Sequence, residues 1–191
     1  MGKLVVTQFV SVDGVFQDPG GVGEIERGGW SFKSEHGDEF DRLKLDELMA
    51  ADAQLLGRVT YEGFAKAWPD MTDEQGFAEK MNSMPKYVVS TTLENPTWTN
   101  TTVIKDNVAE EVAKLKKEVD GDILVAGSGR LVQTLVDEDL VDEWRLMIFP
   151  IIVGQGKHLF GEQSELSMLK LTDSKTIGPD GIIVLTYGRA S

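Results

Sequence analysis

A segment in the second half of the chain, 123–131 (ILVAGSGRL), contains the residue types that bind phosphate. Its apolar run is typical of a buried strand that ends in glycines and opens a helix. Glycine lets the backbone approach a ligand closely, and the unpaired N–H groups of a helix start favour an anion, so a pyrophosphate fits this turn. A tight strand-to-helix turn without a ligand is the alternative. The candidate cofactor-binding residues here are Ala126, Gly127, Ser128, Gly129, Arg130 and Leu131.

The same turn matches the dinucleotide-binding fingerprint of Rossmann folds poorly. Val132 stands where that fingerprint has its third glycine, and the motif lies late in the chain instead of after the first strand. Taken alone, the turn therefore does not identify a ligand.

A second strand end meets a helix start at 56–62 (LGRVTYE). Arg58 carries a permanent charge and a planar fork that suits phosphate oxygens. Gly57 and the hydroxyl of Thr60 lie beside it, and the helix start adds N–H groups. The alternative is a solvated surface arginine.

Three small hydroxyl residues, Ser90, Thr91 and Thr92, follow a third strand-like run at 86–90 (KYVVS). Alone, they are typical of ordinary turn chemistry. However, all three segments lie at the carboxyl ends of expected strands, where open α/β sheets bind their ligands. Together they could hold a pyrophosphate and an additional ribose phosphate, which is the group that distinguishes NADP from NAD.

Short strand-like and helix-like runs alternate through most of the chain, which predicts a three-layer α/β/α domain. A long polar, glycine-rich stretch at 11–30 interrupts this alternation, and loops of such length are usually functional or mobile. Capping boxes are expected at Thr72–Gln75 and Asn107–Glu110. The late strands follow one another without helices, so we expect them to be antiparallel. We expect strands at 3–9, 54–56, 86–90, 102–104, 122–126, 141–149, 166–172 and 182–187, and helices at 35–49, 108–119 and 127–136.

Composition narrows the class of protein. The 191 residues suit a single domain over 1–191, and a net charge of −13 disfavours nucleic-acid binding. The sequence has no cysteine, and His36 and His158 lack ligand spacing, so we expect no disulfide and no metal site. No signal-like or membrane-spanning stretch is found, which makes a cytoplasmic protein without a membrane partner the expectation.

Five segments in this order resemble the dihydrofolate reductase superfamily, and more closely the RibD C-terminal domain, the reductase half of the bifunctional riboflavin-pathway deaminase-reductase. The resemblance spans nearly the whole chain and implies a mixed, mostly parallel sheet of about eight strands that binds NADPH across the carboxyl ends of its central strands. The matching segments are SVDG at 11–14, LLGRVTYEGF at 55–64, PKYVVSTTL at 85–93, DILVAGSGRLVQTLV at 122–136 and LVDEWRLMIFPIIVGQGKHLF at 140–160.

The resemblance also implies roles by position. Gly57, Arg58 and Thr60 would contact phosphate, Ser90 and Thr91 would lie near the adenosine phosphate, and 127–131 would hold the pyrophosphate. Val12, Asp13 and Gly14 would approach the nicotinamide and the substrate. The late strand region 140–160 packs in a homodimer interface in the riboflavin enzymes, so a homodimer is expected here.

Two positions depart from the riboflavin reductases. Those enzymes typically have a glutamate directly before the glycine turn and often a lysine after the SLDG motif, whereas this chain has Ala126 and Val15. The residues that match the cofactor site of the riboflavin reductases are therefore better preserved than those that match the substrate site.

The sequence thus favours an NADPH-dependent reductase of a small heterocyclic or sugar-derived substrate, by default 5-amino-6-(5-phosphoribosylamino)uracil. Asp13 is the candidate catalytic residue, which could orient the substrate or simply cap the turn before Gly14. Trp30, Phe32 and Asp38 are candidate substrate contacts, although Trp30 and Phe32 could equally pack in a core or lid. Two alternatives remain: a pterin or dihydrofolate reductase on the same fold, and an NADP-binding sensor without turnover.

Overall fold

The first strand, β1 (Leu4–Ser11), forms from a run of aliphatic and β-branched residues, nearly all of which are buried. The computed structural model describes residues 1–160 and 166–190. The chain folds into two compact units. Unit 1 comprises Met1–Val5 and Lys44–Val141, and unit 2 comprises Val6–Leu43 and Asp142–Ser191, so β1 begins in one and continues into the other.

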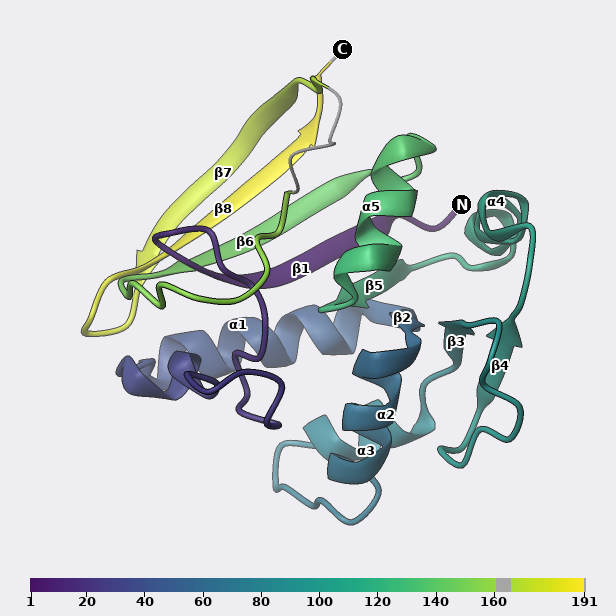
Figure 1. The fold of residues 1–191 in the computed structure, drawn as a ribbon, viewed down its shortest axis with the longest axis horizontal. Helices are drawn as coiled ribbons and strands as arrows, with labels where there is room; N and C mark the ends of the chain where they lie inside the picture. Colours follow the sequence, from purple (N-terminus) through teal and green to yellow (C-terminus); the bar gives the residue numbers. More distant parts are fainter. Residues whose placement is uncertain (161–165, 191) are drawn as a thin grey trace. The chain divides into compact units, whose positions relative to one another are not determined.

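The strands form a mixed sheet with the order β4-β3-β2-β5-β1-β6-β8-β7 (Figure 1). In unit 1, β2 pairs in parallel with both β3 and β5, and β3 pairs in parallel with β4. In unit 2, β8 pairs antiparallel with both β6 and β7. The predicted eight-stranded mixed α/β sheet and its antiparallel ending are confirmed, while a single domain over 1–191 stays a prediction. The remaining strands are β2 (Ala51–Gly57), β3 (Lys86–Val89), β4 (Thr101–Ile104), β5 (Asp122–Ala126), β6 (Glu143–Phe149), β7 (Leu169–Ile177) and β8 (Ile182–Arg189).

Most helices form where apolar residues recur at helical spacing. In the helix after Asn107, buried Val112 and Leu115 lie on one face and lysines and glutamates on the other, as the periodicity predicts. The helices are the short 3-10 helix η1 (Trp30–Lys33), α1 (Gly37–Ala50), α2 (Arg58–Ala67), α3 (Phe77–Ser83), α4 (Val108–Glu118) and α5 (Gly129–Asp137).

Neither predicted capping box forms. Asn107 precedes α4 in the left-handed region, with φ 48°, and its side chain makes no cap hydrogen bond. Ahead of α3 the cap is the carboxylate of Asp73, which accepts from the N–H groups of Gln75, Phe77 and Ala78 at 2.6–3.0 Å. The charged carboxylate of Asp73 therefore caps this helix in place of the Thr72 hydroxyl, which the capping box had predicted as the acceptor.

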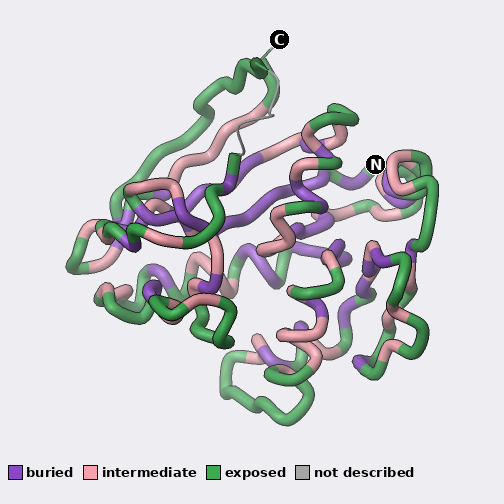
Figure 2. The backbone as a smooth tube through the Cα atoms, viewed as in Figure 1, coloured by how far each residue is buried: buried purple, intermediate pink, exposed green. Residues whose placement is uncertain are grey.

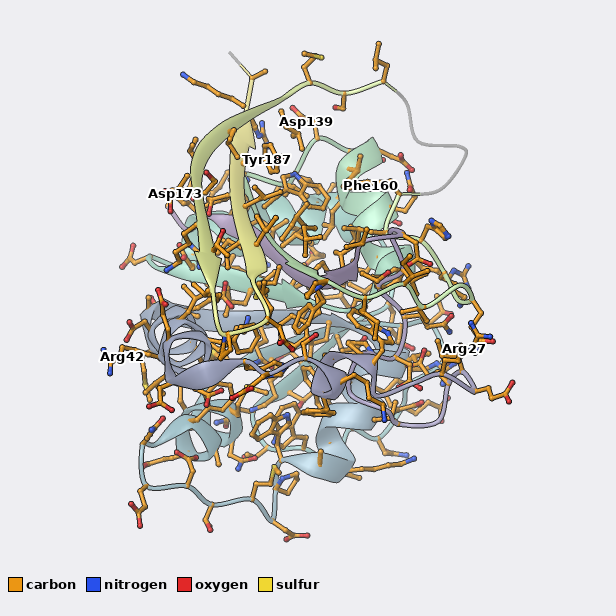
Figure 3. All side chains as sticks on the ribbon, turned by 90° about the vertical axis from the view of Figure 1, so that its left-hand side faces the viewer. Arg27, Arg42, Asp139, Phe160, Asp173 and Tyr187 are labelled. Atoms are coloured by element: carbon orange, nitrogen blue, oxygen red, sulfur yellow. The ribbon has the colours of Figure 1, made fainter. Side chains whose placement is uncertain are left out.

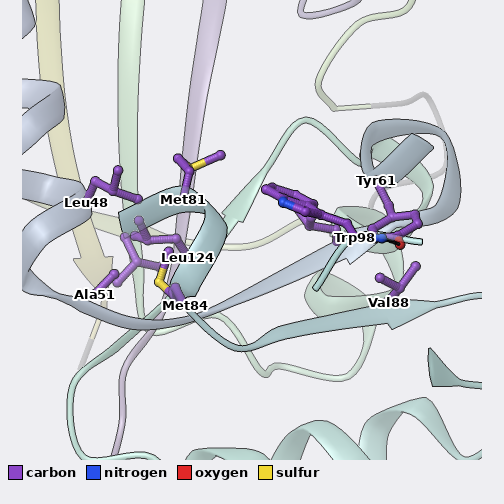
Figure 4. Packing of buried hydrophobic residues seen from close by; sticks show 10 residues of the cluster. Leu48, Ala51, Tyr61, Met81, Met84, Val88, Trp98 and Leu124 are labelled. Carbon is purple, nitrogen blue, oxygen red and sulfur yellow. Dashed lines mark hydrogen bonds between the residues drawn. The ribbon is translucent and has the colours of Figure 1, made fainter. Parts of the chain in front are cut away.

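The core of unit 1 joins its sheet to α2 and α3 (Figure 4). Leu56, Val88 and Leu124 project from neighbouring strands into one cluster with Tyr61. The Tyr61 hydroxyl is not left unpaired, because it accepts the backbone N–H of Trp98 at 3.0 Å. This buried anchor holds α2 with its N-terminus directly after β2.

Unit 2 has a separate core around Phe149, the last residue of β6. The Phe149 ring lies 5.2 Å from Phe9, 5.6 Å from Trp30 and 5.9 Å from Phe40, between ring centroids. Tilted and edge-on ring pairs at these separations are favourable. They connect the long loop after β1 to the sheet of unit 2.

Candidate functional site

The turn between β5 and α5 depends on two residues with left-handed backbone. Gly127 has φ +57°, and a Cβ added there would lie 2.8 Å from Oγ1 of Thr60. Ser128 follows with φ 59°. A side chain at position 127 would therefore have to displace Thr60, which explains why glycine stands at this position.

Ser128 connects this turn to the turn between β2 and α2. The backbone N–H of Ser128 donates to Oγ1 of Thr60 at 3.0 Å, and the Ser128 hydroxyl accepts from the N–H of Gly57 at 2.9 Å. The hydroxyl itself donates to the carbonyl of Ala126 at 2.9 Å. Because β2 and β5 are parallel neighbours, both turns lie at one edge of the sheet of unit 1. The structure thus brings together Gly57, Thr60, Ala126, Gly127 and Ser128.

Two helix N-termini open at this edge, and neither has a side-chain cap hydrogen bond. The first-turn N–H groups of a helix have no intrahelical partner and favour an anion. In α5 these groups belong to Gly129, Arg130 and Leu131; the Arg130 side chain is exposed, whereas Leu131 packs in the interior. The exposed Arg58 donates to both carboxylate oxygens of Glu62, one turn along α2, at 2.9 and 3.0 Å.

Ser90 and Thr91 follow β3, which pairs in parallel with β2, so they share this edge. Ser90 is buried, and its hydroxyl accepts from the N–H groups of Thr92 and Leu93 at 3.2 and 3.0 Å. These bonds close the turn after β3, whereas Thr91 is exposed.

Asp13 lies in unit 2 on the loop after β1, where it connects two turns. Its carboxylate accepts from the Ser11 hydroxyl at 2.6 Å and from the N–H groups of Gly154 and Val153 at 2.8 and 3.1 Å. The Ser11 hydrogen bond, together with these backbone N–H groups, lowers the pKa of Asp13 to about 2, against the opposing effect of burial. Asp13 is therefore ionised at neutral pH and carries no proton to donate.

The neighbours of Asp13 are held by the 151–159 segment of unit 2. The N–H of Val12 donates to the Ile151 carbonyl at 3.0 Å, and the Val12 side chain is exposed. Gly14 has φ +85°, and a Cβ there would lie 3.2 Å from the His158 ring. This glycine therefore suits a turn that a larger residue would strain.

The three candidate substrate contacts have different surroundings. Trp30 is 2% exposed, and its indole N–H donates to the Gln17 carbonyl at 2.8 Å, so it belongs mainly to the core of unit 2. Phe32 is 71% exposed on η1. Asp38 is exposed in the first turn of α1.

Unit 2 also contains a cavity of about 320 Å³ that the sequence did not reveal. Its basic residues had no distinguishing motif, and the apolar wall comes from a segment more than a hundred residues away in the chain. The fold brings these two segments together, and the spacing of residues along the sequence does not show that they are close. The cavity is lined by Glu26, Arg27, Gly28, Trp30, Lys33 and residues 151–153.

In the described part of the chain, no group of three or more histidine, cysteine, aspartate or glutamate side chains is placed to hold a metal ion. Among the same residues, no helix is both long and apolar enough to cross a membrane.

Comparisons with known proteins cover nearly the whole chain. The uncharacterized protein YyaP from Bacillus subtilis (strain 168) is 30% identical over 97% of this chain and 94% of its own. A putative riboflavin biosynthesis protein from Shewanella sp. PV-4 superposes with a TM-score of 0.78 at 22% identity, covering 99% of both chains. Dihydrofolate reductase from Enterococcus faecalis, solved with NADP(H), superposes with a TM-score of 0.58 at 14% identity, covering 100% of this chain and 98% of that one.

These likenesses establish the dihydrofolate reductase-like fold that the sequence predicted. The model of the RibD C-terminal domain matches residues 2–183. The chain belongs to the RibD C-terminal domain family.

Proposed function

We propose that the protein is an NADPH-dependent reductase whose cofactor phosphates bind at the carboxyl edge of the sheet of unit 1. The observation that supports this most directly is the pair of hydrogen bonds that Ser128 accepts from the N–H of Gly57 and donates to Oγ1 of Thr60. They hold two helix N-termini at neighbouring strand ends, where an extended diphosphate could accept from both.

The residues at this edge fit such a group. Because Gly127 has no side chain, Thr60 can approach the turn closely enough for its Oγ1 to accept from the N–H of Ser128, which keeps the start of α5 beside the start of α2. Gly57 and residues 127–131 would hold the pyrophosphate, and Arg58 would contact the additional ribose phosphate, with Thr91 nearby. Ser90 supports this part of the site through the turn that it closes. When bound, NADPH supplies the hydride for reduction of a C=N or C=O carbon.

The candidate residues on the substrate side lie on the loop after β1. They are Val12, Asp13 and Gly14 of unit 2, and ionised Asp13 would act by holding the loop and orienting a donor group rather than by giving a proton. A phosphoribosylamino-pyrimidine is the default by family. Ala126 and Val15 replace the side chains that riboflavin reductases typically use, which widens the range of small heterocyclic substrates to be screened.

Titration of the purified protein with NADPH and NADH, followed by cofactor fluorescence, tests the proposal. We expect binding that favours NADPH and that Arg58→Ala weakens by about tenfold or more, the range of one charge-assisted contact. Lys66→Ala, on the last turn of the same helix, is the matched control because it removes an equal charge from an exposed position. Absence of binding by either nucleotide would exclude the reductase.

A substrate panel then separates turnover from sensing. Oxidation of NADPH in the presence of any heterocyclic substrate identifies a reductase, whereas binding without oxidation across the panel identifies a sensor. The pterin alternative predicts a carboxylate from the first long helix in the substrate cavity. Asp38 is exposed, and the cavity of unit 2 has Glu26 as its acidic lining residue, so no observation favours that alternative.

A homodimer is the proposed assembly, with β8 and β7 providing the surface. Paired residues of antiparallel strands project from the same face, so Ile183, Leu185 and Tyr187 of β8 share a face with Leu171 of β7. Leu171 is 50% exposed and Ile183 44% exposed. In the predicted interface region 140–160, Trp144 and Leu146 of β6 are buried on that face, so β7 and β8 provide its exposed apolar side chains.

The charge of this face favours a second copy of the chain as its partner. A protein with a net charge of −13 repels itself, so self-association requires a surface with few carboxylates. Among the residues of β8 and β7 that share this face, the charged one is Arg189, whose guanidinium lies 3.6 Å from Asp142. Figure 3 shows Tyr187 on β8 beside the β7 strand.

A further inference from the structure

We infer that the cavity of unit 2 binds a small molecule that has a carboxylate or phosphate group, held by Arg27 and Lys33, and a flat apolar body. This inference rests on the proposed function in one respect: it treats the ligand as the substrate of the reductase and predicts that this substrate is an anion. Binding itself requires no cofactor. At about 320 Å³ the cavity is at the lower end of the range for ligand pockets, which suits a single ring and its acid group.

The apolar wall of the cavity is preorganised. The Trp30 ring is held by its hydrogen bond to the Gln17 carbonyl and by an edge-on contact with Phe149 at 5.6 Å. Val153 is 2% exposed, while Ile152 at 75% exposure lies at the solvent side. Since Trp30 and Val153 are each only 2% exposed, they form a rigid base under the cavity, and Ile152 provides most of the apolar surface that a ligand could cover. A rigid base of this kind limits the loss of side-chain entropy on binding.

The two cations of the cavity have no carboxylate partner in the described part of the chain. One guanidinium nitrogen of Arg27, Nη1, donates to the Val153 carbonyl at 2.6 Å, which fixes the side chain on the cavity wall. A guanidinium has five N–H donors, so others remain for a ligand. Lys33, the last residue of η1, makes no hydrogen bond or ion pair through its side chain within the described residues. Figure 3 shows Arg27 at the edge of the loop that follows β1.

The sum of lining charges is positive in a strongly acidic protein. Arg27 and Lys33 oppose Glu26, which leaves one positive charge at the cavity, whereas the whole chain carries −13. Beside an apolar wall, where screening is weaker, this difference selects an anion and disfavours a cation. The planar fork of Arg27 suits both carboxylate and phosphate oxygens.

The test uses the full chain without cofactor and three probes of similar size: benzoate, phenyl phosphate and benzamide. We expect ligand-observed NMR titration to show binding of at least one anion that exceeds that of neutral benzamide about tenfold and that weakens as salt is added. The comparison of benzoate with phenyl phosphate identifies which anionic group the cavity prefers.

Variants assign the binding to the cavity. We expect Arg27→Gln and Lys33→Gln each to weaken the preferred anion about threefold to tenfold, and Glu26→Gln to strengthen it about twofold, because the carboxylate repels the ligand. Lys175→Gln removes an exposed charge from β7 and should change nothing. Lys33 and Glu26 make no side-chain hydrogen bond in the described residues, so these two variants remain informative if Arg27→Gln disturbs the loop.

The inference is overturned if benzamide binds as well as the anions, or if Lys175→Gln weakens binding as much as Lys33→Gln. It is also overturned if Glu26→Gln weakens the anion. NADPH titration of the same samples separates this result from the proposed function. If the protein binds the anion but not NADPH, the reductase proposal is excluded and the cavity site stands. If it binds NADPH but not the anion, only the cavity site is excluded.

Discussion

At the scale of single residues, the Arg58–Glu62 pair determines how readily the guanidinium can meet a phosphate. Both side chains are more than 40% exposed, and such i, i+4 pairs contribute only a few tenths of a kcal/mol, so a dianionic phosphate can compete for Arg58. We therefore expect Glu62→Gln to raise NADPH affinity about twofold to threefold at low salt, with little change for NADH. Fluorescence titrations at two salt concentrations measure both. A fall in NADPH affinity would instead show that Glu62 holds Arg58 in position.

Asp13 makes a prediction about pH. Its pKa is lowered from 3.8 to about 2, so its ionised form stabilises the fold above pH 3.8, and this contribution is lost as the pH falls through about 2. Allowing for solvent screening of a partly exposed group, we expect Asp13→Asn to lower the free energy of unfolding by about 1 kcal/mol at pH 7. In urea titrations the difference from the wild type should shrink between pH 4 and pH 2. Asp41→Asn, at an exposed position on α1, is the control and should show no such difference.

At the scale of elements, one buried lysine joins α3 to the strands that follow it. Lys86 is 0% exposed, and its ammonium group donates to the carbonyls of Asn82, Met84 and Thr99 at 2.8–3.1 Å and lies 4.2 Å from the Trp98 ring centroid. A cation suits the carboxyl end of a helix and the face of an indole. Burial nonetheless lowers the pKa of Lys86 to about 8.

Replacement of this lysine tests the junction. We expect Lys86→Met to lower the free energy of unfolding by about 3 kcal/mol at pH 7, because three buried carbonyls lose their donor. Between about pH 8 and pH 10.5 the unfolded state binds the Lys86 proton and the folded state does not, so wild-type stability should rise in this window. The Lys86→Met variant should lack this rise, and the control Lys105→Met, at an exposed position directly after β4, should retain it. Urea unfolding across the window measures both.

Elements with a strong local pattern could be predicted from the sequence. The run Asp122–Ala126 is β5 with the predicted bounds, and the amphipathic stripe gave α4 within one residue of its end. The caps could not be predicted in the same way, because Asp73 and Thr72 are both good cap residues and the path of the chain decided between them. The two turns that we propose to bind phosphate were singled out from glycine placement, but the hydrogen bonds of Ser128 with Thr60 and Gly57 join residues about seventy positions apart and required the fold.

At the scale of the whole molecule, β7 is the edge strand of the sheet and nearly all of its residues are exposed (Figure 2). Long exposed edges with apolar side chains favour pairing with another chain. The face that contains Leu171, Ile183 and Tyr187 has Arg189 as its charged residue and is otherwise uncharged. Trp144 on the neighbouring β6 is covered there by Phe160, with ring centroids 5.2 Å apart. A second copy packed on this face would bury side chains that the monomer leaves in water.

Sedimentation of the purified chain tests this assembly. We expect the wild type to sediment as a dimer and Leu171→Asp to dissociate it, because a carboxylate buried at a symmetric interface would face its own copy in an already acidic protein. Lys170→Asp changes the charge more but lies on the opposite face of β7, so it should leave the dimer intact. NADPH binding should persist in the monomeric variant, since the proposed phosphate site lies wholly within unit 1. A wild type that is monomeric at high micromolar concentration would instead mean that water covers this face.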